Sequence, residues 1–438
     1  MDYKTIANHI FRAGIEKVLP GKLISESVSL NDDILNINDL SFSLGNISDI
    51  YIVGAGKASA LMAQQIEEIL KDRITKGLVI VKYGHSCNLK LVDVAEAGHP
   101  LPDLKGVEAT QKIIAILEKA GENDLVICLL SGGGSALMVD YPENSNIDEI
   151  IALNDLLIRS GASISEINTV RKHLSHIKGG QLSGVAYPAT VVSLILSDVI
   201  GDPLDAIASG PTAADPTTYR DALHILYKYN LENKAPANII RHLNEGQSGK
   251  IKETPKPDDA VLKKTYNYII GNNRLALEAA AKKALYYNIE PKIITDRLQG
   301  ETESACDFIV NTTLKIKEDS TEKKPLCLIF GGETTVKVSG TGTGGRNQHL
   351  ALLCAEKIAG ISGITILSGG TDGTDGPTDA AGAIVDSNTV LMANLKQLDI
   401  HKYIKDFNSY KFFKEVEGHI FTGPTMTNVM DIVIVIVE

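Results

Sequence analysis

A lysine follows a glycine-rich turn early in this chain of 438 residues, in a setting that suits anion binding. Lys57 ends the run Gly54-Ala-Gly56-Lys57, which follows the β-branched segment Ile50–Val53 and precedes a helix-forming segment, Ala58–Leu70. A strand, a glycine turn and a helix in that order bring backbone N–H groups and a positive helix N-terminus together. The run therefore predicts a phosphate or nucleotide site at Gly54, Gly56 and Lys57. The structural alternative is a tight turn with a solvated lysine.

A second cation, Arg346, also follows a glycine-rich loop. The loop Ser339–Gly345 contains four glycines and leads into Arg346-Asn347-Gln348, at the start of a helix expected to reach Ile358. Lys57 and Arg346 are therefore the two candidate cations of a functional site, each placed directly after a glycine-rich turn.

Six polar loops follow apolar strand-like segments directly, and ligands of open α/β sheets bind outside the carboxyl ends of the strands. We therefore expect a single cleft between two sheets. The loops are Gly54–Lys57, Ser131–Ser135, Ser197–Asp202, Gly271–Asn273, Gly331–Thr335 and Ser368–Asp375. Besides the two glycines above, the predicted cofactor-binding residues are Ser131, Gly132, Gly133, Gly134, Ser135, Asp198, Glu333, Asn347, Asp372 and Asp375.

Phosphoryl transfer fits these residue types. It requires cations around the phosphate oxygens, a carboxylate for Mg²⁺ and a group that orients the acceptor hydroxyl. Lys57 and Arg346 supply the cations, and the Ser131–Ser135 amides form an anion cradle. Asp198 is the first choice for the metal or for orienting the acceptor hydroxyl. Mg²⁺ and a phosphate-bearing ligand are therefore expected at the site, although no Walker A sequence is present.

A dinucleotide-dependent reductase is the main alternative. An NAD site needs an acidic residue at the end of the second strand, to hold the ribose hydroxyls. Here that segment ends Val81-Lys82-Tyr83-Gly84, without a carboxylate, and Lys82 would suit only the 2′-phosphate of NADP. A non-catalytic sensor of a nucleotide or another small molecule is a third class, which the many charged loop residues argue against.

Composition indicates an ordinary soluble globular protein. Hydrophobic residues make up 44% and charged residues 22%, and the net charge is −11. No Lys/Arg-rich block suggests a nucleic-acid or membrane partner. The longest apolar run, Ile432–Val437, is too short to span a bilayer, and no signal peptide is visible. The five cysteines are widely spaced, as expected for reduced thiols in a cytoplasmic protein.

Apolar strands alternate with helices, which predicts a doubly wound α/β architecture. We expect two domains, residues 1–250 and 251–438, with the linker in the polar stretch Asn244–Lys263. An amphipathic helix is expected at Tyr3–Leu19, followed by a polar, irregular segment up to Ser48. Expected strands are Ile50–Val53, Gly77–Lys82, Val92–Ala97, Asp124–Leu130, Thr190–Leu196, Tyr266–Ile270, Pro291–Thr295, Leu326–Phe330, Ile364–Leu367 and Asp431–Val437.

The chain resembles the class II glycerate kinases, the glycerate 2-kinases of the MOFRL/DUF4147 family, over nearly its whole length. The motifs that carry the resemblance are Gly54-Ala-Gly-Lys57-Ala, Ala97-Gly-His-Pro-Leu-Pro-Asp103, Leu130-Ser-Gly-Gly-Gly-Ser-Ala136, Asn168-Thr-Val-Arg-Lys-His-Leu-Ser175 with Ile177-Lys-Gly-Gly180, Leu196-Ser-Asp-Val-Ile-Gly-Asp-Pro203 with Ser209-Gly-Pro-Thr212, Gly331-Gly-Glu-Thr334, Gly344-Gly-Arg-Asn-Gln348, Ser368-Gly-Gly-Thr-Asp-Gly-Thr-Asp-Gly376, and Thr422-Gly-Pro-Thr425 with Thr427-Asn428. One departure is Gln181, where the family commonly has arginine.

The resemblance implies two three-layer α/β/α domains: an N-terminal Rossmann-like parallel sheet and a C-terminal mixed-sheet MOFRL-type domain, with the active site in the cleft between them. It implies transfer of the ATP γ-phosphate to D-glycerate, usually giving 2-phosphoglycerate, with Lys57 and Arg346 as catalytic cations. Two alternatives remain: a hydroxypyruvate reductase, a name carried by some relatives, and a kinase that gives 3-phosphoglycerate. We expect a monomer or homodimer.

Overall fold

The protein consists of two compact units. The computed structural model describes residues 2–319 and 324–438. The first unit is Pro20–Ile270, and the second combines residues 2–19 with Gly271–Glu438. The predicted boundary at residues 250 and 251 differs from this division in two ways. The polar stretch after it still belongs to the first unit, and the N-terminal helix belongs to the second.

The first unit is built on a six-stranded sheet in the order β6-β5-β4-β7-β8-β9. The pairs from β6 to β8 are parallel. Numbered along the chain, this order is 3-2-1-4-5-6, which is the order of dinucleotide-binding α/β folds. The strands are β4 (Ile50–Ala55), β5 (Lys76–Lys82), β6 (Val92–Ala97), β7 (Leu125–Leu130), β8 (Thr190–Leu196) and β9 (Thr265–Gly271).

Helices cover both faces of this sheet. On one face α3 packs with α2 and a three-stranded antiparallel meander, β1-β2-β3, whereas α4 and α8 share a core with the other face. The expected irregular segment before Ser48 is therefore wrong. These elements are α2 (Pro20–Ser27), α3 (Ser59–Leu70), α4 (Leu104–Leu117), α5 (Gly134–Leu137), α8 (Gln181–Ala186), β1 (Val28–Asn31), β2 (Ile34–Ile37) and β3 (Leu40–Ser43).

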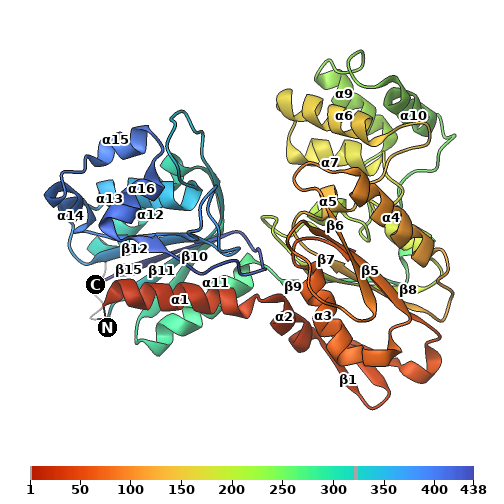
Figure 1. Ribbon diagram of the computed structural model, residues 1–438, viewed down its shortest axis with the longest axis horizontal. Coiled ribbons are helices and arrows are strands. Elements are labelled where there is room, and N and C mark those ends of the chain that lie inside the picture. Colours follow the sequence, from red (N-terminus) through yellow and green to blue (C-terminus); the bar gives the residue numbers. More distant parts are fainter. Residues whose placement is uncertain (1, 320–323) are drawn as a thin grey trace. The chain divides into compact units, whose positions relative to one another are not determined.

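Four further helices of the first unit form a helical cluster with its own apolar core (Figure 1). They are α6 (Ile147–Arg159), α7 (Ile164–Lys172), α9 (Tyr219–Lys228) and α10 (Ala237–Gln247). Local sequence fixes where three of them begin. Asn146 caps α6, and Ser163 and Thr218 open α7 and α9 with reciprocal capping boxes.

The second unit is built on a mixed sheet in the order β10-β11-β15-β12-β13-β14. β10 and β11 are parallel, and the pairs from β11 to β14 are antiparallel. The apolar run at the C-terminus forms β15, a central strand with every residue buried. The strands are β10 (Glu290–Glu301), β11 (Leu326–Thr335), β12 (Ile364–Gly370), β13 (Gly382–Asp386), β14 (His419–Ile420) and β15 (Asp431–Val437).

The N-terminal helix α1 covers one face of this second sheet together with α11, and α12 and α13 cover the other face (Figure 1). Phe11 of α1 packs beneath Gly369 of β12, where a Cβ would lie 2.6 Å from the ring. Three layers result, as predicted. The helices are α1 (Tyr3–Lys17), α11 (Asn273–Tyr286), α12 (Thr302–Asp319), α13 (Arg346–Lys357), α14 (Thr389–Leu395), α15 (Ile400–Lys405) and α16 (Ser409–Val416).

Most of the predicted strands are confirmed. Two of them are longer than expected, because β10 continues to Glu301 and β11 to Thr335, so the expected loop Gly331–Thr335 is part of β11. The prediction for Tyr266–Ile270 is wrong in one respect, because this segment forms β9 of the first sheet and does not begin a second one. Four cysteines are buried and all five are free thiols. Within the described residues, no helix combines the length and apolar character needed to cross a membrane.

Candidate active site

The first candidate site lies where the strand order of the first sheet reverses, between β4 and β7. Loops on either side of such a point diverge to opposite faces and leave a crevice at the carboxyl ends of the strands. Gly54–Lys57 begins with the last two residues of β4, and Ser131–Ser135 follows β7, so both predicted segments lie at this crevice. Asp198 follows the next strand, β8.

The two loops contact each other too closely for larger side chains. A Cβ on Gly56 would lie 2.1 Å from Ser131 Oγ, and Gly56 has φ of +142°. The Ala58 N–H donates to Ser131 Oγ at 3.0 Å, and the Lys57 N–H donates to the Gly132 carbonyl at 2.9 Å. Gly56 and Ser131 therefore join the two loops, and the Ser131 hydroxyl is already used in that contact.

The side chain of Lys57 is not held by the protein. Within residues 2–319 and 324–438, no hydrogen bond or ion pair engages its Nζ. Its positive charge nevertheless acts on two neighbours. Burial raises the pKa of Asp198 and the charge of Lys57 opposes that rise. Burial, and then Lys57, lower the pKa of His99 to about 4, so that this imidazole is neutral at pH 7.

Asp198 lies against the glycine turn after β7. A Cβ on Gly132 would lie 2.0 Å from Asp198 Oδ2, so only glycine leaves room for this carboxylate. In the same way a Cβ on Gly133 would lie 2.9 Å from the His99 ring. Lys57, Asp198, His99 and the turn thus form one cluster, which we call the lysine cluster.

The turn itself offers backbone donors. In the described part of the chain, the N–H groups of Gly132 and Gly133 have no acceptor. Gly133 is left-handed, with φ of +88°, and precedes the short helix α5 that starts at Gly134. Successive amides in such a turn converge on one point and bind anions. Ser135 completes the predicted cradle, and its Oγ lies 2.6 Å from Ser209 Oγ.

The second candidate site surrounds Arg346, the first residue of α13. Asp431, at the start of β15, accepts from Arg346 Nε at 2.7 Å and from Nη2 at 3.0 Å. Glu333 lies 2.8 Å from Nη1. Burial would lower the pKa of Arg346, but these two carboxylates outweigh it and raise the pKa. The guanidinium is thus charged and firmly positioned.

Asp375 acts on the start of α13. Its carboxylate accepts from the Asn347 N–H at 3.0 Å and from the Gln348 N–H at 2.8 Å. Gly345, the N-cap residue, has no side chain to make such a bond, so Asp375 caps the helix from the loop after β12. Burial raises the pKa of Asp375 to about 6.

The side chains of Asn347 and Asp372 form hydrogen bonds with other residues of the protein. Asn347 is 1% exposed; its amide donates to Asp431 Oδ1 at 2.9 Å and accepts from Ser368 Oγ at 2.7 Å. Asp372 accepts from the Thr374 N–H at 3.2 Å, as turn residues do. Asn347 therefore supports Asp431, and through it Arg346. Nucleotide contact by these two residues stays a prediction.

The sequence pattern did not single out Asp431, which the structure places against Arg346. Asp431 stands immediately before the apolar run Ile432–Val437, and an acid at the start of a buried strand was the available signal. His99 and Arg171 lie within motifs that carry the family resemblance.

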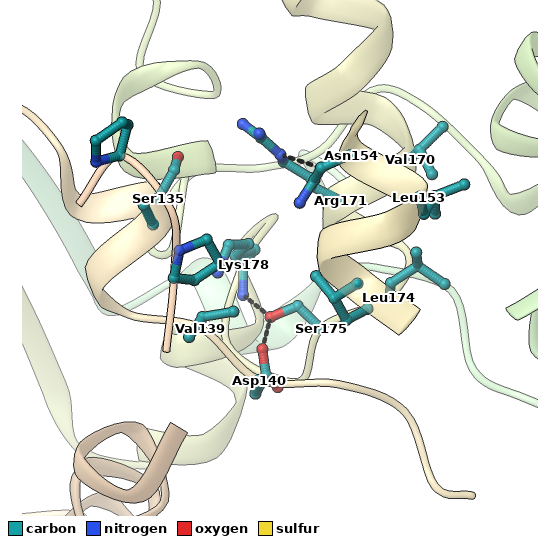
Figure 2. Close-up of a pocket in the computed structure, with 14 residues that line it drawn as sticks. Ser135, Val139, Asp140, Leu153, Asn154, Val170, Arg171, Leu174, Ser175 and Lys178 are labelled. Atoms are coloured by element: carbon teal, nitrogen blue, oxygen red, sulfur yellow. Dashed lines mark hydrogen bonds between the residues drawn. The ribbon is translucent and has the colours of Figure 1, made fainter. Parts of the chain in front are cut away.

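A pocket in the first unit lies beside the Ser131–Ser135 turn, between α5, α6 and α7 (Figure 2). Ser135, Asn154, Arg171 and Lys178 line it together with apolar side chains. Burial lowers the pKa of Lys178 to about 8, while Asp140 favours its charged form.

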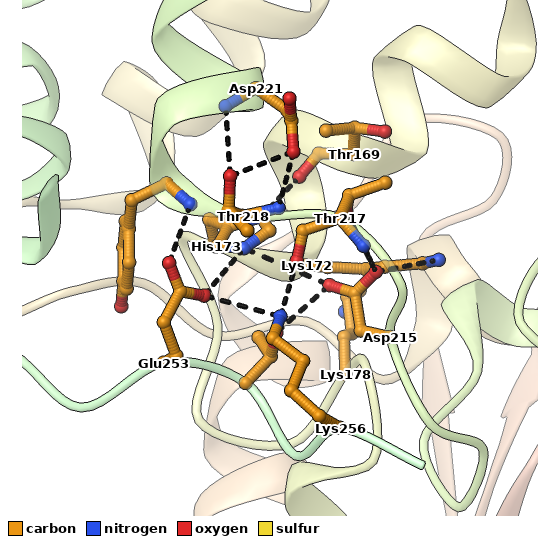
Figure 3. A network of polar contacts seen from close by, with 12 residues as sticks. Thr169, Lys172, His173, Lys178, Asp215, Thr217, Thr218, Asp221, Glu253 and Lys256 are labelled. Atoms are coloured by element: carbon orange, nitrogen blue, oxygen red, sulfur yellow. Dashed lines mark hydrogen bonds and ion pairs between the residues drawn. The ribbon is translucent and has the colours of Figure 1, made fainter.

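A buried ionic network lies at the C-terminal end of α7 (Figure 3). Lys172, 2% exposed, contacts Asp205 at 2.9 Å and Asp215 at 3.4 Å. Thr217 and Thr254 also donate to Asp215, so its buried charge is fully bonded. The network joins the helical cluster to the segment around Thr254.

Comparison with known proteins decides the family. Residues 6–244 match a family described as a domain of unknown function (DUF4147), and residues 326–431 match the MOFRL family. A glycerate 2-kinase from Pyrococcus horikoshii is 41% identical, with 100% of this chain and 98% of that protein covered. The chain belongs to the glycerate kinase family.

Further relatives of this chain were found by sequence and by structure. A D-glycerate 2-kinase from Thermotoga maritima is 41% identical, over 98% of this chain and 97% of its own length. The crystal structure of the Thermotoga maritima glycerate kinase superposes with a TM-score of 0.88 at 40% identity, covering 100% of this chain and 99% of that one. A protein from Agrobacterium vitis, 39% identical over 87% of this chain and 85% of its own length, is named a putative hydroxypyruvate reductase.

Proposed function

We propose that this protein transfers the γ-phosphoryl group of ATP to the 2-hydroxyl of D-glycerate, which gives 2-phosphoglycerate and ADP. The observation that carries the proposal is the lysine cluster. In this cluster, Lys57 and the amides of Gly132 and Gly133, which have no hydrogen-bond partner among the described residues, lie at the switch point of a nucleotide-type sheet. These are the groups that phosphate oxygens require.

In the reaction, the acceptor oxygen forms a bond to the γ-phosphorus while the bond to the β,γ-bridging oxygen breaks. Lys57 and the amides of Gly132 and Gly133 stabilise the charge on the phosphate oxygens, because fixed cations and dipoles need no reorganisation during the reaction. Asp198 orients the acceptor hydroxyl or binds the metal. We propose that turnover also depends on Arg346, whose position Asp431 and Glu333 fix.

Mg²⁺ fits this arrangement through Asp198. No group of three metal-ligating side chains occurs among the described residues. A magnesium ion of a kinase does not need one, because one or two carboxylates and the substrate phosphates hold it. Asp198, set against Gly132, is the carboxylate closest to the proposed phosphate cradle. When bound, Mg²⁺ neutralises charge on the phosphates.

The reductase alternative lacks a comparable observation. β5 ends at Lys82 without a carboxylate at that position, and a ribose hydroxyl pair needs one. The expectations of a monomer or homodimer, of a cytoplasmic location and of no nucleic-acid partner stay predictions.

One experiment separates the functions. ³¹P NMR of the protein with ATP, Mg²⁺ and D-glycerate should show ADP and the resonance of 2-phosphoglycerate. NADPH oxidation at 340 nm with hydroxypyruvate and without ATP would instead support the reductase. The site assignment is tested by Lys57→Ala and Arg346→Ala, each of which should lower kcat by roughly 100-fold or more at saturating substrates. Near-normal turnover of both variants would refute it.

A further inference from the structure

Arg171 of α7 is a partly buried arginine without an acidic partner. Its Nε donates to Asn154 Oδ1 of α6 at 2.9 Å. Across the described ranges, no carboxylate lies within ion-pair distance of its guanidinium, and burial alone lowers its pKa. An unpaired charge in such a place is costly unless a ligand compensates it.

The guanidinium faces a pocket and leaves its terminal amino groups available. Figure 2 shows Arg171 and Ser135 on opposite walls, with the guanidinium directed away from α7. The hydrogen bond from Nε to Asn154 fixes the plane of the group. The two terminal nitrogens therefore present the fork that binds a carboxylate or phosphate through two parallel hydrogen bonds.

The charge balance of the pocket is also positive. Lys178, 4% exposed, lines it and donates to the Met138 carbonyl. The one carboxylate in the lining, Asp140, is already used, because it accepts from Ser175 Oγ and, at 2.5 Å, from the His176 N–H. Two cations thus share the pocket with a single acid that is fully hydrogen-bonded.

The pocket adjoins the proposed phosphate cradle, since Ser135 belongs to both. Apolar side chains, which include Val139, Leu153 and Leu174, make up much of the remaining lining. Ion pairs strengthen in such surroundings. A small anion with a nearby hydroxyl therefore fits better here than the neutral adenine ring of ATP.

We propose that this pocket binds the carboxylate of glycerate, with Arg171 as its main partner. The inference rests on the proposed function. Arg346 is the less suitable candidate, because two carboxylates already neutralise it. In glycerate the 2-hydroxyl is on the carbon next to the carboxylate and the 3-hydroxyl is one carbon farther. Arg171 thus selects the hydroxyl that faces the γ-phosphate.

The test compares D-glycerate with its neutral amide, D-glyceramide, on the full-length protein at saturating ATP. The wild type should favour the acid by at least about 100-fold in kcat/KM, since a site with a buried charge rejects a ligand that leaves it unpaired. In Arg171→Gln this preference should fall to less than about 10-fold, mostly through KM for glycerate, with KM for ATP unchanged. Arg171→Lys should lie between the two and give a larger share of 3-phosphoglycerate by ³¹P NMR.

Arg159→Gln is the matched control, because Arg159 ends α6, is exposed and pairs with Asp155. It should keep wild-type preference. Calorimetric titration of D-glycerate without ATP gives a second readout, in which Arg171→Gln should weaken binding at least about 10-fold. Equal circular dichroism spectra exclude misfolding.

Three results would overturn the inference. If Arg171→Gln keeps the wild-type preference for D-glycerate over D-glyceramide, Arg171 has only a structural role. A raised KM for ATP with an unchanged KM for glycerate would assign the pocket to the nucleotide. Glycerate binding that is equal in the wild type and Arg171→Gln would refute the carboxylate site directly. Wild-type protein that binds glycerate through Arg171 but does not phosphorylate it would contradict the proposed function instead.

Discussion

Asp431 holds Arg346 by two hydrogen bonds, of 2.7 Å to Nε and 3.0 Å to Nη2, from the first residue of the central strand β15. A carboxylate and a guanidinium that meet in this way are fixed in both distance and plane. Asp431 is 5% exposed, and Asn347 donates to the same carboxylate. The position of Arg346 is therefore determined by the sheet, through Asp431, and not by the glycine loop before it.

We expect Asp431→Asn to lower kcat by roughly 100-fold while KM for ATP changes little, because misplacing a catalytic group by about 1 Å has an effect of that size. Asparagine can accept only through its single amide oxygen, so the paired geometry is lost. Steady-state kinetics with D-glycerate and ATP measure the effect. Asp307→Asn removes an exposed carboxylate that pairs with Lys357 and is the control. Wild-type kcat in Asp431→Asn would show that Arg346 needs no such support.

The charge of Lys57 should have a measurable effect on the pKa of His99. The pKa of His99 is about 4, owing first to burial and then to the positive charge of Lys57. Replacing Lys57 by Met removes that charge, which favours the imidazolium, so the pKa of His99 should rise toward its ordinary value. NMR titration of the histidine ring protons, assigned with His99→Gln, measures it. If the pKa of His99 is unchanged in Lys57→Met, the charge of Lys57 does not act on His99, whatever the catalytic role of Lys57.

The strands were predictable because most are buried on both faces and read as short apolar runs. Asp124–Leu130, Thr190–Leu196 and Asp431–Val437 are clear examples. The meander before Ser48 was missed because its strands have four residues each and are partly exposed, which leaves no apolar run. For β9 the strand was predicted correctly, but its partner is decided by packing against β8, which a sequence pattern does not show.

The candidate site was predictable as a set of loops but not as a set of contacts. A polar residue after a buried strand must lie at the carboxyl edge of the sheet, and Lys57, Gly132 and Asp198 do. Which way a side chain points depends on neighbours from distant parts of the chain. Asp375 points to the α13 amides because Gly345 cannot cap that helix, and Asn347 points to Asp431. The pattern gave no sign of either contact.

Asp375 should make the second unit less stable as the pH rises. Its pKa is about 6 in the folded protein and 3.8 as the ordinary value, so the folded state binds the proton more tightly. The stability that this proton contributes to the folded state is fully present below the pKa of the unfolded state. It is lost as the pH rises through about 6. The difference amounts to at most about 3 kcal/mol. Asp375→Asn lacks this ionisation, so the gap between the free energies of unfolding of wild type and variant should shift by that amount between pH 4 and pH 7.

Asp375→Asn also alters the cap of α13, which changes the free energy of unfolding at every pH. The test is therefore how the difference between wild type and variant, measured by urea unfolding, changes with pH. Asp399→Asn, which changes an exposed N-cap of α15, should show an offset that does not change with pH. A gap that stays constant from pH 4 to pH 7 would mean that Asp375 titrates normally.

The buried network around Lys172 should matter for stability far more than an exposed ion pair of the same type. Lys172→Met leaves Asp215, which is fully buried, without its cation, and removing one partner of a buried pair costs about 3 kcal/mol or more. Lys228→Met is the matched control in the same helical cluster. It breaks the exposed pair with Glu166, for which less than about 1 kcal/mol is expected. Urea unfolding followed by circular dichroism compares the two. Adding Asp215→Asn to Lys172→Met should restore part of the lost stability, because it removes the uncompensated charge. Equal losses in Lys172→Met and Lys228→Met would show that the network does not stabilise the protein as a buried ionic core.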